Sequence, residues 1–507
     1  MRNHYSKKSM LALAAMMLAP AFSMQAGWGS AETPDIVFRS DDISSLHTAR
    51  TADGKTYLVW AAWSGIVGDG YNLHMQLLDA DGNSMWGDEG IVLETKPNAS
   101  WFADYSIVTT ENGDAIVSWA DAREDPEGDY QSLTPVLYKI SQQKEMLWGE
   151  DGVFLGADYR FPPKLYNVEG DIYAKIYVAG EEEAAVLTRL DADGGFAVEP
   201  VSFSGSIIPS VGGDFIAVYT GAQGTEAMRY NRDIQPVWSA PALVSSYLYE
   251  GYDTDPFILE SDGMGGVVIS YIRPMGMFGH MPIVQYVSAD GEPVFGEAVD
   301  VYGTEMYDHL YPVLAVDQAD QSIFCAWQMS GGVAILAGQQ FDFFGERTWG
   351  DEGRILASKD DPSGYTYGAM DAACLVNGNW LVCFANELGW AQNQMNVGVY
   401  DHAGNEIWCR HVSTPGAIYN YSCYLEGDDY YIFWVNEVTD DDWNTERMIQ
   451  TVKISDVTTG VETITSDSAR KDIEAYYSLD GARHSSPVKG VNIVRYSDGS
   501  SRKIMVK

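Results

Sequence analysis

Tyrosine is concentrated in short segments that precede strand-like stretches of this 507-residue chain, and twelve of its 31 tyrosines fall there. Aromatic rings stack on sugar rings or on cationic side chains, and nearby carboxylates accept hydrogen bonds from hydroxyl groups. These residue types predict a carbohydrate or a protein as ligand. The candidate ligand-binding residues are Tyr105, Tyr252, Tyr307, Tyr311, Tyr367, Tyr421, Asp121, Arg123 and Trp390.

A tyrosine beside a strand has a competing interpretation. Its ring can wedge between two structural repeats, with its hydroxyl donating to a loop carbonyl. Both interpretations stay open for each of these residues.

Catalytic residues are not identified, and whether the protein is an enzyme stays open. The sequence contains no HExxH, no G-x-S-x-G and no phosphate-binding loop. Glycoside hydrolysis needs only two suitably spaced carboxylates, and the chain has 72 acidic residues. A glycoside hydrolase or lyase that uses paired carboxylates is therefore the first alternative to a binding protein. A non-catalytic structural or adhesive surface protein is the second.

No metal site and no cofactor are predicted. The run Asp79-Ala-Asp-Gly-Asn83 has the composition of a calcium loop but lacks the distal glutamate of an EF-hand, so we interpret it as a turn. The acidic run at positions 440–442 is the other cation candidate. Ca²⁺ remains an alternative at these two places.

The elements that would position these residues form a repeat. Trp86-Gly-Asp-Glu-Gly-Ile-Val-Leu93 returns almost unchanged at Trp148 and Trp349. The full set of repeat-marking aromatics is Trp28, Trp86, Trp148, Phe196, Trp238, Phe295, Trp349 and Trp408. Their spacing is about 54 residues, a length typical of four antiparallel strands per repeat.

Each repeat contains apolar strand patterns joined by turn sequences. In the second repeat we expect strands at 106–110, 114–119 and 135–140, and a fourth beginning near Trp148. The last repeat lacks a fourth strand, which the segment Trp28–Phe38 can supply. The fold class is therefore all-β: a β-propeller of eight four-stranded blades closed by the N-terminal strand, with seven blades as the alternative. The tryptophans that begin the repeat motif are expected to pack between blades.

Two resemblances follow from these motifs. The D-x-x-G…W-G-x-x-G-x-x-L repeat over residues 27–460 resembles exported bacterial propellers, which implies a fold and no activity. The end of the chain resembles the C-terminal sorting segment of proteins exported by the type IX secretion system of Gram-negative bacteria. The matching residues are Tyr477…Gly481, Lys489-Gly490, the strand Val491–Val494 and the closing Arg502–Lys507. This resemblance implies export and sorting machinery as a partner, and surface attachment after export.

The beginning of the chain is typical of a secretory signal. Arg2, Lys7 and Lys8 precede the apolar run Met10–Pro20, and cleavage is expected after Ser23 or Ala26. The expected domains are a signal peptide at 1–26, the propeller at 27–460 and a sorting-like β segment at 461–507. No transmembrane segment is expected. The protein is predicted to be exported, and to be secreted or attached to the cell surface.

Charge and cysteine content limit the partners further. The formal net charge is −41, and a surface this acidic excludes nucleic acid as a ligand bound through a basic patch. Five cysteines occur, all in the C-terminal part of the chain, and we expect mostly buried free thiols. Cys374 with Cys383 is the best candidate for a disulfide.

Overall fold

The structure of the protein is a computed structural model. It describes residues 27–506 except 31–32, 41, 65–69, 96–104, 124–132, 181–184, 248–255, 276–278, 304–307, 331–333, 359–366, 390–391, 414–415, 440–444, 459–472, 479–481, 485 and 497–500. The predicted signal peptide lies outside the described residues. The boundary predicted between residues 460 and 461 also lies outside them, so both domain boundaries stay predictions.

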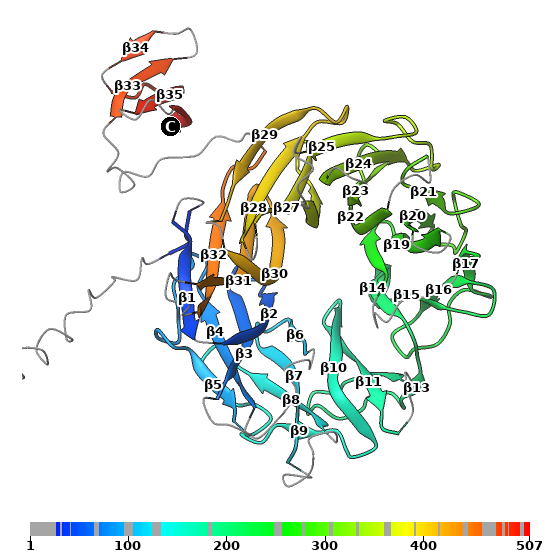
Figure 1. The fold of residues 1–507 in the computed structure, drawn as a ribbon. Helices are drawn as coiled ribbons and strands as arrows, with labels where there is room; N and C mark the ends of the chain where they lie inside the picture. The colour runs from blue at the N-terminus through cyan, green and yellow to red at the C-terminus, as the bar shows by residue number, and fades with distance from the viewer. Residues whose placement is uncertain are drawn as a thin grey trace, which may run out of the picture.

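Eight four-stranded antiparallel sheets follow one another around a ring, which confirms the eight-bladed propeller (Figure 1). Within each of the first seven blades the strands pair in sequence order, and the labelled first strands β6, β10, β14 and β22 lie toward the inside of the ring. The third and fourth repeats are shorter than the others, yet each forms a complete four-stranded blade, so the seven-blade alternative is wrong.

Blades 1 to 4 consist of β2 (Ile43–Arg50), β3 (Thr56–Trp63), β4 (Tyr71–Leu78) and β5 (Ile91–Glu94); β6 (Ile107–Thr109), β7 (Ala115–Asp121), β8 (Thr134–Ile140) and β9 (Val153–Phe154); β10 (Tyr159–Val168), β11 (Asp171–Val178), β12 (Ala185–Arg189) and β13 (Val201–Ser202); and β14 (Ser206–Pro209), β15 (Phe215–Thr220), β16 (Thr225–Tyr230) and β17 (Ala242–Ser245). A 3₁₀ turn, η1 (Val211–Gly213), joins the first two strands of blade 4.

Blades 5 to 8 consist of β18 (Ile258–Ser261), β19 (Val267–Met275), β20 (Gly279–Val287) and β21 (Val299–Asp300); β22 (Asp308–Asp317), β23 (Ser322–Ser330), β24 (Ala334–Asp342) and β25 (Arg354–Ser358); β26 (Tyr367–Cys374), β27 (Trp380–Gly389), β28 (Gln392–Tyr400) and β29 (Glu406–His411); and β30 (Ala417–Glu426), β31 (Asp429–Thr439), β32 (Thr445–Ile454) and β1 (Asp35–Ser40).

The second strand of each blade forms the centre of its core. In β3 every residue except the last is buried, and in β7 every residue is buried. A strand covered on both faces needs apolar side chains at successive positions rather than in alternation. This requirement explains the runs Y-L-V-W-A-A and A-I-V-S-W-A in the sequence.

The ring closes through strand β1, as the sequence predicts. β1 pairs antiparallel with β32, from Asp35 opposite Thr451 to Ser40 opposite Arg447. Blade 8 therefore combines the two ends of the propeller sequence. Because β1 and β32 pair with each other, neither is left as a strand without a partner. Strand β1 begins at Asp35, whereas the sequence predicts a closing segment that begins at Trp28. Trp28 therefore lies ahead of the strand.

The repeated tryptophan does not begin the fourth strand of its blade, contrary to the prediction for Trp148. It lies in the connection before that strand, which starts at Val153. Its indole Nε1 donates to a carbonyl in the turn between the third and fourth strands of the next blade. Trp86 donates to Gln142 (3.0 Å) and Trp349 to His402 (2.7 Å). The expected packing role between blades is confirmed.

The five cysteines are all free thiols. The predicted Cys374–Cys383 disulfide is wrong, because Cys374 lies opposite Trp380 in the pairing of β26 with β27 while Cys383 lies opposite Asp371. A separation of three register positions is about 10 Å along the strands, which is too far for a disulfide.

A ninth four-stranded sheet forms the C-terminal β module that the sequence predicts. It contains β33 (Ile473–Ser478), β34 (Arg483–His484), β35 (Gly490–Tyr496) and β36 (Ser501–Val506), in the order β34-β33-β35-β36. Within the described part of the chain, no helix is long and apolar enough to cross a membrane.

Candidate functional site

Bulges interrupt the first strands of several blades at the inner side of the ring. In β22 the register shifts between Leu310 and Val313, and in β30 it shifts between Tyr419 and Tyr421. β26 shifts between Ala369 and Asp371. A bulge bends the strand and turns a side chain away from the regular alternation. These three bulges occur in consecutive blades, 6, 7 and 8.

Two of these bulges place a residue other than glycine in the left-handed region of backbone conformation. Tyr311 has φ 53° and Asn420 has φ 36°. Such residues cost free energy of about 1 kcal/mol or more, and strained positions of this kind gather at functional sites. Both residues line the same cavity.

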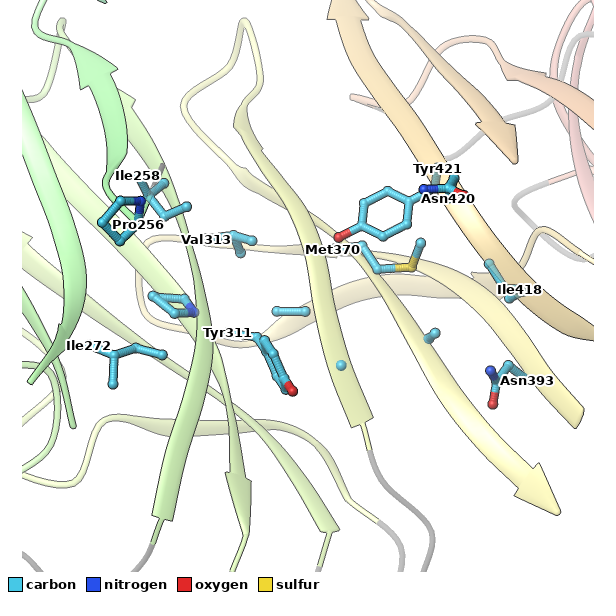
Figure 2. A pocket seen from close by; sticks show the side chains of 14 residues that line it. Pro256, Ile258, Ile272, Tyr311, Val313, Met370, Asn393, Ile418, Asn420 and Tyr421 are labelled. Atoms are coloured by element: carbon cyan, nitrogen blue, oxygen red, sulfur yellow. The ribbon is translucent and has the colours of Figure 1, made fainter. Parts of the chain in front are cut away.

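The cavity occupies the channel wall formed by blades 5 to 8 and has a volume of about 550 Å³. Figure 2 shows the side chains of Tyr311 and Tyr421 entering it from β22 and β30. Cavities of this size are typical of small-molecule sites. The lining residues are Pro256, Ile258, Ile272, Tyr311, Pro312, Val313, Gly368, Ala369, Met370, Ala385, Asn393, Ile418, Asn420 and Tyr421.

The polar groups of the cavity are uncharged. The two tyrosines are accessible, with exposed fractions of 59% for Tyr311 and 44% for Tyr421. Burial raises the pKa of Tyr421 to about 12, so its hydroxyl stays protonated and can donate. The amide Oδ1 of Asn420 accepts a hydrogen bond from the backbone nitrogen of Ser45 at 3.1 Å, which holds this side chain between blades 8 and 1.

Two carboxyl groups lie beside the cavity. Glu260 is two positions from the lining residue Ile258 on β18, and the two side chains point to the same side because a strand alternates. Asp371 follows the lining residue Met370 on β26 and accepts a hydrogen bond from the hydroxyl of Tyr430 at 2.6 Å. The two groups are near enough to interact electrostatically.

Both carboxyl groups bind their protons unusually tightly. Burial raises the pKa of Glu260 to about 7, and the charge of Asp371 adds to this effect. Burial also raises the pKa of Asp371 to about 6, although the hydrogen bond from Tyr430 acts in the opposite direction. An acid with a pKa near neutrality can donate or accept a proton in catalysis.

The structure brings two of the predicted ligand-binding residues together, Tyr311 and Tyr421. Tyr105 is buried, and its hydroxyl donates to the carbonyl of Ser45 at 2.5 Å. This is the packing role that the sequence left as the alternative. Tyr252, Tyr307 and Trp390 lie outside the described residues. β26 begins at Tyr367, but the side chain of this residue lies outside the described part.

Asp121 and Arg123 form an ion pair away from the cavity. The Arg123 guanidinium donates to both oxygens of Asp121, with 2.7 Å between Nη2 and Oδ2. It also contacts the carbonyl of Asp151 at 2.7 Å and the carboxylate of Glu94 at 3.4 Å. Asp121 is fully buried. Because Glu94 belongs to blade 1 and the others to blade 2, this network joins two blades.

Asn393, Asn420, Met370, Glu260 and Asp371 were not predicted from the sequence. Met370, Asp371 and Asn420 lie at bulges, which leave no residue signature because a bulge is defined by the partner strand. Asn adopts the left-handed conformation more readily than most residues, so the residue type at position 420 agrees with its φ. Tyr rarely adopts this conformation, so the residue type at position 311 does not indicate it.

Acidic turns have a structural explanation. Asp79 Oδ1 accepts hydrogen bonds from the backbone nitrogens of Asp81 (3.0 Å) and Asn83 (2.8 Å), which stabilises the turn. The acidic run 440–442 lies outside the described residues. Among the residues that the structure does describe, no group of three or more His, Cys, Asp or Glu side chains is arranged to hold a metal ion.

No family model matches the sequence, and no curated protein matches it. Solved structures that are similar include a protein of unknown function from Dyadobacter fermentans, with 9% identity, a TM-score of 0.36 and coverage of 82% of this chain and 97% of that one. The polysaccharide lyase Uly1 has 10% identity, a TM-score of 0.40 and coverage of 86% and 94%. Prolyl oligopeptidase B from Galerina marginata has 11% identity, a TM-score of 0.40 and coverage of 78% and 56%. Likenesses this distant say nothing of function.

Proposed function

We propose that this propeller binds a neutral carbohydrate in the cavity that blades 5 to 8 form together. The observation that carries the proposal is the pair of exposed tyrosine rings, Tyr311 and Tyr421, beside the amides of Asn393 and Asn420. Aromatic faces stack on the apolar faces of sugars, and amides and phenol hydroxyls bond to their hydroxyl groups. Of the ligand-binding residues predicted from the sequence, the proposed site uses Tyr311 and Tyr421.

The charges of the cavity lining and of the whole protein favour a neutral ligand. None of the described residues that line the cavity is charged. The protein as a whole carries a formal net charge of −41, and a negative field repels a sulfated or uronic-acid polysaccharide. A protein ligand, the other partner expected from the sequence, would have to present a neutral or basic segment to the same cavity.

A glycan array followed by calorimetry on the purified chain tests the proposal. Tyr311→Ala and Tyr421→Ala should each weaken binding about tenfold, because each removes one stacking face. Phe344→Ala is the matched control: it removes an aromatic ring that is 76% exposed in the turn between β24 and β25. Binding that is absent in the wild type, equal in the tyrosine variants, or stronger for acidic glycans contradicts the proposal.

Hydrolysis of a glycan is a second candidate function, favoured by the two interacting carboxyl groups. Glu260, with its pKa raised to about 7, would be the general acid, and Asp371 the base. Glu260→Gln and Asp371→Asn should lower the release of reducing ends at least a hundredfold, whereas Glu89→Gln, in an exposed turn, should not change it. A chain with neither binding nor turnover fits the structural or adhesive alternative.

We also propose that the chain is exported and held at the cell surface through its C-terminal segment. The proposal is supported by the signal-like residues at 2–20 and by the resemblance of the end of the chain to type IX sorting segments. Its partner would be the export and sorting machinery. Deleting residues 461–507 should leave the propeller in the periplasm, as surface proteolysis and cell fractionation would show. Unchanged surface exposure contradicts the sorting role.

A further inference from the structure

Two of the five cysteines meet across the boundary between blades 7 and 8. Cys383 is on β27 and fully buried, whereas Cys423 is on β30, the first strand of the next blade, and half-buried. Both side chains pack in one apolar cluster, and their thiols lie close enough for Cys383 to raise the pKa of the Cys423 thiol. Among the described residues, no other two cysteines belong to one apolar cluster.

The remaining cysteines have other surroundings. Cys325 is buried in blade 6, where its thiol lies 4.0 Å from the carbonyl of Ala326. Cys374 donates to the carbonyl of Leu375 at 3.5 Å. Cys409 is exposed on β29. Cys383 and Cys423 are therefore the pair of thiols that oxidation within one molecule would join.

The thiol pair lies against the wall of the cavity. Asp371, beside the lining residue Met370, is directly opposite Cys383 in the strand pairing. The lining residue Tyr421 is two positions from Cys423 on β30, after the bulge, so the two side chains leave the same face of the strand. A covalent bond at Cys423 would therefore fix the strand segment that carries Tyr421.

We propose that Cys383 and Cys423 form a reversible disulfide that ties blade 7 to blade 8 at the wall of the cavity. The oxidant is a disulfide, either of a thiol–disulfide exchange protein or of a small molecule. The thiolate of Cys423, the more accessible of the two, attacks the donor disulfide and releases one thiol. The thiolate of Cys383 then displaces the second. The two cysteines lose two protons and two electrons, and the donor gains them as two thiols.

The surroundings set the conditions for this reaction. Contact with the Cys383 thiol and burial both raise the pKa of the Cys423 thiol. Because the thiolate is the reacting form, oxidation should accelerate as the pH rises. The bond would close a loop of the chain between positions 383 and 423, which restricts the unfolded chain and stabilises the fold.

The test is a count of free thiols on the full chain, denatured after incubation with oxidised glutathione. Oxidation should lower the count from five thiols by two, and peptide mapping should link the segment containing Cys383 to that containing Cys423. The melting temperature should rise by several degrees and return with a reductant. Cys383→Ser and Cys423→Ser should each abolish the loss, whereas Cys325→Ser should keep it.

Three outcomes would overturn the proposal: all thiols remaining free after oxidation, a mapped bond between other cysteines, or the same loss of thiols in Cys423→Ser. Peptide mapping of the wild type decides the matter even where a serine variant fails to fold. The result is independent of glycan binding, because it is read from thiol chemistry alone.

Discussion

The indole Nε1 of Trp28 donates a hydrogen bond of 2.9 Å to the carbonyl of Ala80. Trp28 precedes the strand that completes blade 8, and Ala80 lies in the turn before the last strand of blade 1. The contact therefore joins the last blade to the first, in the same way that Trp86 and Trp349 join blades along the ring. One hydrogen bond repeated from blade to blade explains why the tryptophan returns in the sequence.

The same contact explains the glycine of the turn, and it gives the first prediction. A Cβ at Gly82 would lie 2.6 Å from the backbone nitrogen of Trp28 and 2.7 Å from its ring. Gly82→Ala should lower the free energy of unfolding by about 2–4 kcal/mol, from backbone strain plus overpacking. Gly87→Ala is the matched control, since Gly87 has nearly the same φ, +87° against +89°, with nothing within 4 Å. Chemical denaturation measures both, and equal losses would contradict the packing explanation.

The closing strand should be required for a stable monomer. Removing residues 1–40 leaves the edge of β32 without its partner β1, along with the apolar surface under Trp28, whose ring lies 5.0 Å from that of Tyr431. An unpaired edge strand is a template for association with another chain. We expect oligomers or aggregates in sedimentation analysis and a lower melting temperature. A truncated chain that stays monomeric and melts as the full chain does would show that closure is dispensable.

Deprotonation of the channel acids should reduce the stability of the fold as the pH rises from acid to neutral. The pKa of Glu260 is about 7 in the folded protein against an ordinary value of 4.5, so the folded state holds the proton more tightly. The resulting stabilisation is complete below pH 4.5 and is lost as the pH rises to about 7. Glu260→Gln should be more stable than the wild type at pH 8, by on the order of 1–3 kcal/mol, and should lose this advantage at pH 4.

Melting curves of the two proteins between these pH values measure the difference. The acidic surface changes its self-repulsion with pH in both proteins, so the difference isolates Glu260. Glu89→Gln, which removes an exposed acid, should follow the wild type. A constant difference across the pH range would contradict a raised pKa.

Salt should stabilise the whole propeller. The chain has 72 acidic residues against 31 Lys and Arg, and like charges repel across a compact surface. The melting temperature should rise with NaCl because mobile ions screen this repulsion. CaCl₂ at equal ionic strength separates screening from site binding: an extra rise would support the calcium alternative at the acidic turns. A melting temperature that responds to neither salt would contradict the role of charge.

The sequence determined the blades, because each depends on local chemistry. A strand covered on both faces needs an unbroken apolar run, a tight turn needs glycine, and the contact between blades needs the indole donor. These requirements recur about every 54 residues, so eight blades and their closure by the N-terminal strand could be predicted. The sequence predicts that the fourth strand begins near the tryptophan, whereas in the structure the tryptophan lies in the connection before that strand. Turns and strand starts use the same residue types, so the sequence does not separate them.

The tertiary structure alone decided the cavity. Tyr311 and Tyr421 are 110 positions apart and line one cavity only because blades 6 to 8 curve around one axis. Their direction depends on bulges set by partner strands. Tyr105 has the same residue type and also belongs to the first-strand side of its blade, just ahead of β6, yet it is buried between blades. Glu260 with Asp371, and Cys383 with Cys423, likewise come together across blades. Side-chain direction at a bulge is a property of two or more strands, and no single segment of sequence contains it.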